Sequence, residues 1–199
     1  MGDLLAIKLR CFPKHITTVL VGYLLGPAEA GLLRLARELS SMLSKPALLI
    51  RQVIFADLTR NWNQGNQAFD VIAYRTALLG GLLGMLFVVI SYFFGEYLLA
   101  ALLGQQFVAA KAVLTFMLLA ATLDLAASPL RSALYAMGYA LKAMRLYVLS
   151  TIMYLGLFIL LTKDMGLIGA GVAASVAAAL PLIGMLVLIG GNRQDSHKS

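Results

Sequence analysis

Residues 76–95 read TALLGGLLGMLFVVISYFFG and carry no charged side chain between Arg75 and Glu96. A transmembrane helix needs about 20 consecutive apolar residues, so this stretch predicts a membrane span. Residues 146–162 and 165–190 are also apolar and uncharged over nearly their whole length, and each predicts a further span. These three stretches indicate an integral membrane protein.

The composition of the whole chain agrees with this class. Of its 199 residues, 61% are hydrophobic and 13% are charged, and the mean hydropathy is +0.87. Soluble domains carry roughly 45–50% apolar and about 25% charged residues. The chain has too little polar surface to cover a water-soluble sphere, which excludes a soluble cytosolic enzyme.

Three further segments are apolar but interrupted by charges, and they raise the expected number of spans to about six. The expected spans lie near residues 10–26, 30–56, 72–95, 108–137, 142–162 and 166–190. The predicted fold is an all-α, polytopic transmembrane helix bundle forming a single lobe over residues 1–191, followed by a polar tail at 192–199. Gly26-Pro27 predicts a tight turn, and residues 96–106 predict a short interfacial helix.

The basic residues predict an orientation in the membrane. The formal net charge is +7, and cytoplasmic loops of membrane proteins concentrate Lys and Arg. Alternate ends of the six spans place ten basic residues on one side: Lys8, Arg10, Lys14, Arg51, Arg60, Arg75, Lys142, Arg145, Arg193 and Lys198. The other side has four: Arg34, Arg37, Lys111 and Lys163. Both termini are therefore expected in the cytoplasm. Most of the excess charge is attributed to topology rather than to binding of nucleic acid, and a cationic cavity for an anionic lipid headgroup is the alternative interpretation.

Charged residues inside the expected spans fall on two helical faces. At about 100° per residue, one arc about 100° wide holds Arg34, Arg37, Glu38, Ser41, Lys45 and Gln52. A second stripe, about 60° wide by the same spacing, holds Asp124, Ser128, Arg131 and Tyr135. A charge at mid-bilayer normally faces protein or water. The two polar faces therefore predict a shared, water-filled cavity.

Each charged group also has a structural alternative. Arg34 and Glu38 are spaced to neutralise each other, and Arg34 and Arg37 are placed to extend toward the membrane interface. Asp124 and Arg131 are spaced for an ion pair between neighbouring turns. His15 is more typical of a packed interfacial histidine than of a proton relay.

The remaining motifs concern packing rather than chemistry. Gly80 and Gly84 match the small-xxx-small pattern of close helix approach, and Gly166–Ala179 (GLIGAGVAASVAAA) is rich in small residues. Pro46, Pro129 and Pro181 are expected to kink or break their helices. The sequence has a single cysteine, Cys11, and it has no catalytic triad, phosphate loop or paired acidic motif. We therefore expect no catalytic residues, no metal site and no cofactor.

The order of several short segments resembles the carboxyl half of bacterial polysaccharide flippases. These are the O-antigen and lipid-linked oligosaccharide exporters of the multidrug/oligosaccharidyl-lipid/polysaccharide superfamily. The segments are Val21–Gly31 (VGYLLGPAEAG), Ile54–Asn66 (IFADLTRNWNQGN), Leu103–Lys111 (LGQQFVAAK), Leu134–Tyr139 (LYAMGY) and Gly166–Ala174 (GLIGAGVAA). Together they extend the resemblance over nearly the whole chain.

The resemblance implies one lobe of a two-lobed transporter in the bacterial cytoplasmic (inner) membrane. Such proteins move an undecaprenyl-diphosphate-linked oligosaccharide, for O-antigen or exopolysaccharide, across the membrane by alternating access. The second lobe would come from homodimerisation or from a separate chain, and membrane lipids are the other expected partners. On this model Arg34, Arg37, Lys45, Arg131 and Lys14 bind the diphosphate, while Glu38, Asp124 and His15 tune the charge or carry coupling protons.

Three alternatives remain open at this stage. In the first, the chain is a non-transporting membrane component or remnant of a polysaccharide assembly system, and the polar faces form helix contacts. In the second, the chain is a lobe like those of multidrug exporters, an alternative that the positive net charge disfavours. In the third, the chain is a membrane enzyme of glycan-lipid synthesis. Such an enzyme would need clustered acidic residues in its cytoplasmic loops, and only Asp57 and Asp70 lie in the expected ones.

Overall fold

All regular secondary structure in the described part of the chain is helical. A computed structural model describes residues 17–23, 25–42, 66–102, 104–136 and 139–196, and these contain helices and no strand. The long helices are α3 (Asn66–Leu102), α4 (Lys111–Ala136), α5 (Ala140–Met165) and α6 (Leu167–Ser196), with a 3-10 helix, η2 (Gln105–Ala110), between α3 and α4. Residues 17–23 and 27–42 are also helical.

Four of these helices have the length and hydropathy of membrane spans. The apolar segments are Tyr74–Tyr97, Lys111–Tyr135, Ala140–Met165 and Leu167–Leu188. The all-α helix bundle is confirmed, and these four candidate spans overlap the four spans expected after residue 70. The two spans expected near residues 10–26 and 30–56 lie partly outside the described residues. Pro46 lies outside them.

The helix boundaries correct one prediction. Residues 96–102 continue α3 and do not form a separate interfacial helix. α3 ends at Leu102, shortly before Gly104, whose φ of 102° suits glycine and whose N–H donates to the carbonyls of Leu99 and Ala100 at 3.1 Å. Glu96 lies within α3 and pairs with Lys111, with Nζ and Oε1 2.9 Å apart.

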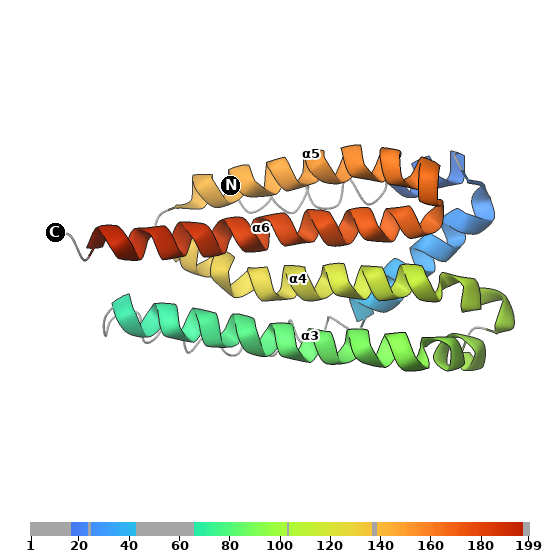
Figure 1. Cartoon of the computed structure of the whole chain (residues 1–199), viewed down its shortest axis with the longest axis horizontal. Coiled ribbons are helices and arrows are strands. Elements are labelled where there is room, and N and C mark those ends of the chain that lie inside the picture. Colours follow the sequence, from blue (N-terminus) through green and yellow to red (C-terminus); the bar gives the residue numbers. More distant parts are fainter. Residues whose placement is uncertain (1–16, 24, 43–65, 103, 137–138, 197–199) are drawn as a thin grey trace.

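The other local predictions hold in part. Gly26 has a φ of 111° at the turn before residues 27–42, and its carbonyl accepts a hydrogen bond from the Ala30 N–H at 3.2 Å. Pro129 and Pro181 lie inside α4 and α6 without ending either helix. Figure 1 shows α4 changing direction near its C-terminal end. α6 continues to Ser196 and so includes part of the expected polar tail.

The four long helices lie side by side in the order α3, α4, α6, α5, which differs from their order in the chain (Figure 1). Consecutive helices run in opposite directions. Most of the α4 span is buried between its neighbours, whereas few residues of the α3 and α5 spans are buried, because these helices lie at the two edges of the row. α4 and α6 therefore form the centre of the bundle.

Small residues allow the close approach at this centre. A Cβ on Gly84 would collide with the side chain of Thr122, and a Cβ on Gly171 would lie 2.8 Å from the Cβ of Phe116. These contacts join α3 to α4 and α6 to α4. The prediction that the glycine motifs serve packing is confirmed at both seams.

Two apolar cores occupy the two ends of the bundle. The first joins residues 17–42 to the end of α3, the start of α4, the end of α5 and the start of α6, and includes Leu33, Val113 and Phe158. The second lies toward the opposite ends of those long helices and includes Leu130 and Met185. All four long helices contribute to both cores, so each of them connects the two ends of the bundle.

Candidate functional site: two arginines along α5

Arg37 is held by three hydroxyl groups from two parts of the chain. Its Nη2 donates to Thr17 Oγ1 at 2.7 Å and to Tyr154 Oη at 2.9 Å, and its Nη1 donates to Thr18 Oγ1 at 3.0 Å. Thr17 is fully buried, and Arg37 and Tyr154 are half-buried. We call Arg37, Thr17, Thr18 and Tyr154 the Arg37 cluster. Its hydroxyls fix the direction of the guanidinium without adding negative charge.

The Arg37 cluster meets α5 close to the middle of its length. Tyr154 is close to the middle of α5 (Ala140–Met165), so its hydroxyl is placed near the middle of a helix long enough to cross the bilayer. An arginine at the centre of a transmembrane helix costs about 2.5–3.5 kcal/mol on insertion scales. Charge-assisted hydrogen bonds to the three hydroxyls offset part of that cost.

Arg131 forms a second cluster with a carboxylate and an aromatic ring. Its Nη2 lies 3.5 Å from Asp124 Oδ1, and its guanidinium carbon lies 4.4 Å from the centre of the Tyr147 ring. The side chain of Arg131 is 17% exposed and that of Asp124 is 45% exposed. We call these three residues the Arg131 cluster. The predicted ion pair between Asp124 and Arg131 is confirmed as a contact within α4.

The two clusters meet the same face of α5. Tyr147 and Tyr154 are seven residues apart, which at 3.6 residues per turn places them about 20° apart around the helix and about 10 Å apart along it. One of these tyrosines contacts Arg131 and the other contacts Arg37. α5 therefore presents a polar, aromatic face that contacts two guanidinium groups at two points along its axis.

The other predicted site residues separate into two groups. Arg34 and Glu38 are exposed and form no ion pair with each other in the described part of the chain. Lys14, His15 and Lys45 lie outside the described residues. The shared water-filled cavity and the roles of these residues stay predictions.

Neither Tyr147 nor Tyr154 of α5 was predicted from the sequence. Their signal was present, because the helical-face arithmetic applied to Arg34–Lys45 also places Tyr147, Thr151 and Tyr154 on one face of an otherwise apolar stretch. Thr17 and Thr18 of the Arg37 cluster gave a weaker signal, because they are isolated polar residues in an apolar segment.

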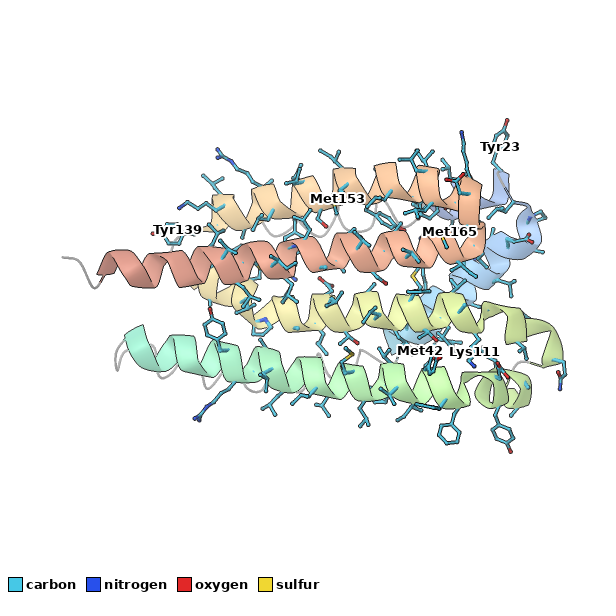
Figure 2. All side chains as sticks on the ribbon, in the orientation of Figure 1. Tyr23, Met42, Lys111, Tyr139, Met153 and Met165 are labelled. Carbon is cyan, nitrogen blue, oxygen red and sulfur yellow. The ribbon has the colours of Figure 1, made fainter. Side chains whose placement is uncertain are left out.

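A third charged contact lies at one end of the bundle. The pair between Lys111 and Glu96 is exposed, and Lys111 Nζ also lies 5.7 Å from the centre of the Tyr92 ring. Figure 2 shows Lys111 between α3 and α4. This contact joins the two helices near the turn that connects them and has no part in either arginine cluster.

Comparisons with protein-family models, with curated proteins and with solved structures find no match to this chain. The contacts around Arg37 and Arg131 therefore carry the functional conclusion.

Proposed function

We propose that the chain is one lobe of a flippase for an undecaprenyl-diphosphate-linked oligosaccharide in the bacterial cytoplasmic membrane. The observation that carries the proposal is an arginine near mid-span, Arg37, oriented by three hydroxyls. A guanidinium group matches the geometry of phosphate oxygens and forms strong charge-assisted hydrogen bonds with them. Arg131 adds a second cationic group along the same face of α5.

The proposed mechanism uses the two arginines along α5 and requires a second lobe. The headgroup is attracted from one leaflet to a cationic face at mid-depth, where the charge of the diphosphate is compensated while it is away from water. Rocking of the two lobes then opens that face to the other leaflet. The second lobe is supplied by another copy or by a separate chain.

The charges at the helix ends support an orientation with both termini in the cytoplasm. Arg75, Lys142, Arg145 and Arg193 lie toward one end of the bundle formed by α3, α4, α5 and α6. The opposite end holds Lys111 and Lys163, accompanied by Glu96 and Asp164. The end with more basic residues is assigned to the cytoplasm.

Binding of fluorescently labelled undecaprenyl diphosphate to the purified chain in mild detergent tests the proposal. Arg37→Ala and Arg131→Ala are each expected to weaken binding about 10-fold or more, since loss of a charge-assisted hydrogen bond costs about 1.5–3 kcal/mol. Arg145→Ala is the matched control, because it removes the same charge from an exposed position of α5. Undecaprenol, the neutral lipid, should bind all variants equally. Wild-type affinity in Arg37→Ala, or an equal loss in Arg145→Ala, contradicts the proposal.

A non-transporting membrane component is the second candidate. It is favoured by the fact that Arg37 and Arg131 each contact α5 from another part of the chain, as structural links between helices do. In that case the two alanine variants lower the melting temperature of the protein, and neither the diphosphate nor the neutral lipid stabilises it.

A further inference from the structure

α3 joins the bundle through one narrow stripe. Its buried residues include Ala77, Gly84 and Ser91, spaced seven apart, followed by Gly95 and Leu99. Within the described residues this stripe packs on α4 and η2. Small side chains let the two backbones approach closely, but they leave most of the circumference of α3 outside the bundle.

The remaining surface of α3 is a wide apolar arc. The exposed large hydrophobic residues between Arg75 and Glu96 are Leu78, Leu79, Leu82, Leu83, Met85, Leu86, Val89, Ile90, Tyr92, Phe93 and Phe94. At about 100° per residue they cover about 200° of the helix, from Tyr92 and Met85 on one edge to Leu83 and Phe94 on the other. We call this surface the α3 arc. Figure 2 shows side chains projecting from the outer side of α3, away from α4.

The α3 arc is too wide for one protein partner. A helix that packs on a neighbour uses an apolar stripe about 100° wide, roughly half of this arc. A second lobe or a second copy placed against α3 would leave the other half in contact with something else. A fluid of acyl chains covers an arc of any width.

The length and ends of the α3 arc also match a bilayer. From Leu78 to Phe94 the helix rises about 24 Å, close to the hydrocarbon thickness of about 30 Å. At one end four exposed aromatic residues follow one another closely: Tyr92, Phe93, Phe94 and Tyr97. They adjoin the Lys111–Glu96 ion pair. Tyrosine is enriched where hydrocarbon meets water.

We propose that the α3 arc faces lipid acyl chains on both of its sides, and that its aromatic end lies at one membrane–water interface. This inference does not depend on the proposed transport activity. It assigns α3 to the outside of any assembly, so a second lobe must contact a surface other than α3.

Fluorescence quenching by brominated lipids tests the proposal. The native tryptophan is removed by Trp62→Phe, and Leu83→Trp and Met85→Trp are introduced one at a time. These positions differ by two residues, hence about 3 Å in depth, but lie on opposite edges of the α3 arc. Each protein is reconstituted in phosphatidylcholine vesicles with and without bromine atoms on the acyl chains.

Both edge variants are expected to lose the same fraction of their emission in brominated lipid. Phe158→Trp, at a position with no exposed surface, is the buried control and should keep its emission. Protection of one edge alone identifies a protein occupant and overturns the proposal, as does emission from both edges as high as that of Phe158→Trp. If the buried variant does not fold, the comparison of the two edges with each other and with unbrominated lipid still decides.

A depth measurement tests the interface assignment. Leu86→Trp, near the middle of the α3 arc, should be quenched most by bromines deep in the acyl chain. Tyr97→Trp should be quenched most by bromines close to the headgroup. Equal quenching profiles for the two positions, or the reverse order, contradict the assigned interface.

Discussion

Tyr154→Phe removes one hydroxyl from the Arg37 cluster and leaves the ring in place. The lost hydrogen bond joins Arg37 Nη2 to Tyr154 Oη at 2.9 Å. A hydrogen bond to a charged group contributes about 1.5–3 kcal/mol. Because both side chains are half-buried, we expect the lower part of that range, about 1.5–2 kcal/mol of unfolding free energy.

Arg37→Met gives the second side of a double-mutant cycle. It removes three hydrogen bonds, together about 4.5–6 kcal/mol at the same value per bond, and it also removes the cost of about 2.5–3.5 kcal/mol for an arginine at mid-span. The net loss from these terms is therefore expected at about 1–3.5 kcal/mol. In the Arg37→Met background, Tyr154→Phe should cost close to nothing, because its hydroxyl no longer has the guanidinium as a donor.

The assay is equilibrium unfolding in mild detergent with increasing dodecyl sulfate, followed by far-ultraviolet circular dichroism. The coupling energy is the difference between the effects of Tyr154→Phe in the two backgrounds. Tyr23→Phe is the control, because Tyr23 is 90% exposed and its substitution should change stability by less than about 0.5 kcal/mol. If Tyr154→Phe costs the same in both backgrounds, Arg37 is not the group that its hydroxyl stabilises, and the reasoning is refuted.

Two further predictions concern the seam and the orientation. Gly84→Ala should destabilise the protein by about 1–3 kcal/mol, because its Cβ would lie within 2.8 Å of Thr122 Cβ, whereas Gly81→Ala, whose Cβ would lie 3.8 Å from the nearest atom, should stabilise it by about 0.5–1 kcal/mol. Melting temperatures in detergent check this, and a Gly84→Ala protein at least as stable as Gly81→Ala contradicts the close seam. In a Cys11→Ser background, Lys163→Cys should react with a membrane-impermeant maleimide added outside intact cells, and Lys142→Cys only after permeabilisation. Labelling in the opposite order reverses the proposed topology.

The spans were predictable because their signal is local. An uncharged run such as residues 76–95 must bury its backbone polar groups within itself in a bilayer, and only a helix does so in a single segment. The turn at Gly26 and the contact between Asp124 and Arg131 were predictable for the same reason, since their parts lie within a few residues of each other. The end of α3 was misassigned because Glu96 bounds the uncharged run, whereas the helix itself continues past this residue to Leu102.

The lateral order of the helices was not predictable in this way. Helix faces lined by glycine and alanine fit several neighbours equally well, so the sequence does not specify that α6 lies between α4 and α5. The Arg37 cluster depends on that order, because Tyr154 is 117 positions away from Arg37 in the chain. The arginine was identified from its own position, and its partner was not.

The position of α6 between α4 and α5 has a consequence for biogenesis. α3 and α4 leave the ribosome as one hairpin, and α5 and α6 follow as a second. The contact that unites them includes Gly171 against Phe116 and a hydrogen bond of 2.8 Å from Ser175 Oγ to the Phe116 carbonyl. This contact forms only after the last helix has been inserted. Until then the inner face of α4 is exposed to lipid, which makes the first hairpin an incomplete species open to chaperones and membrane proteases. Two separately synthesised hairpins should find each other through the same seam, since no step in their union requires a continuous chain.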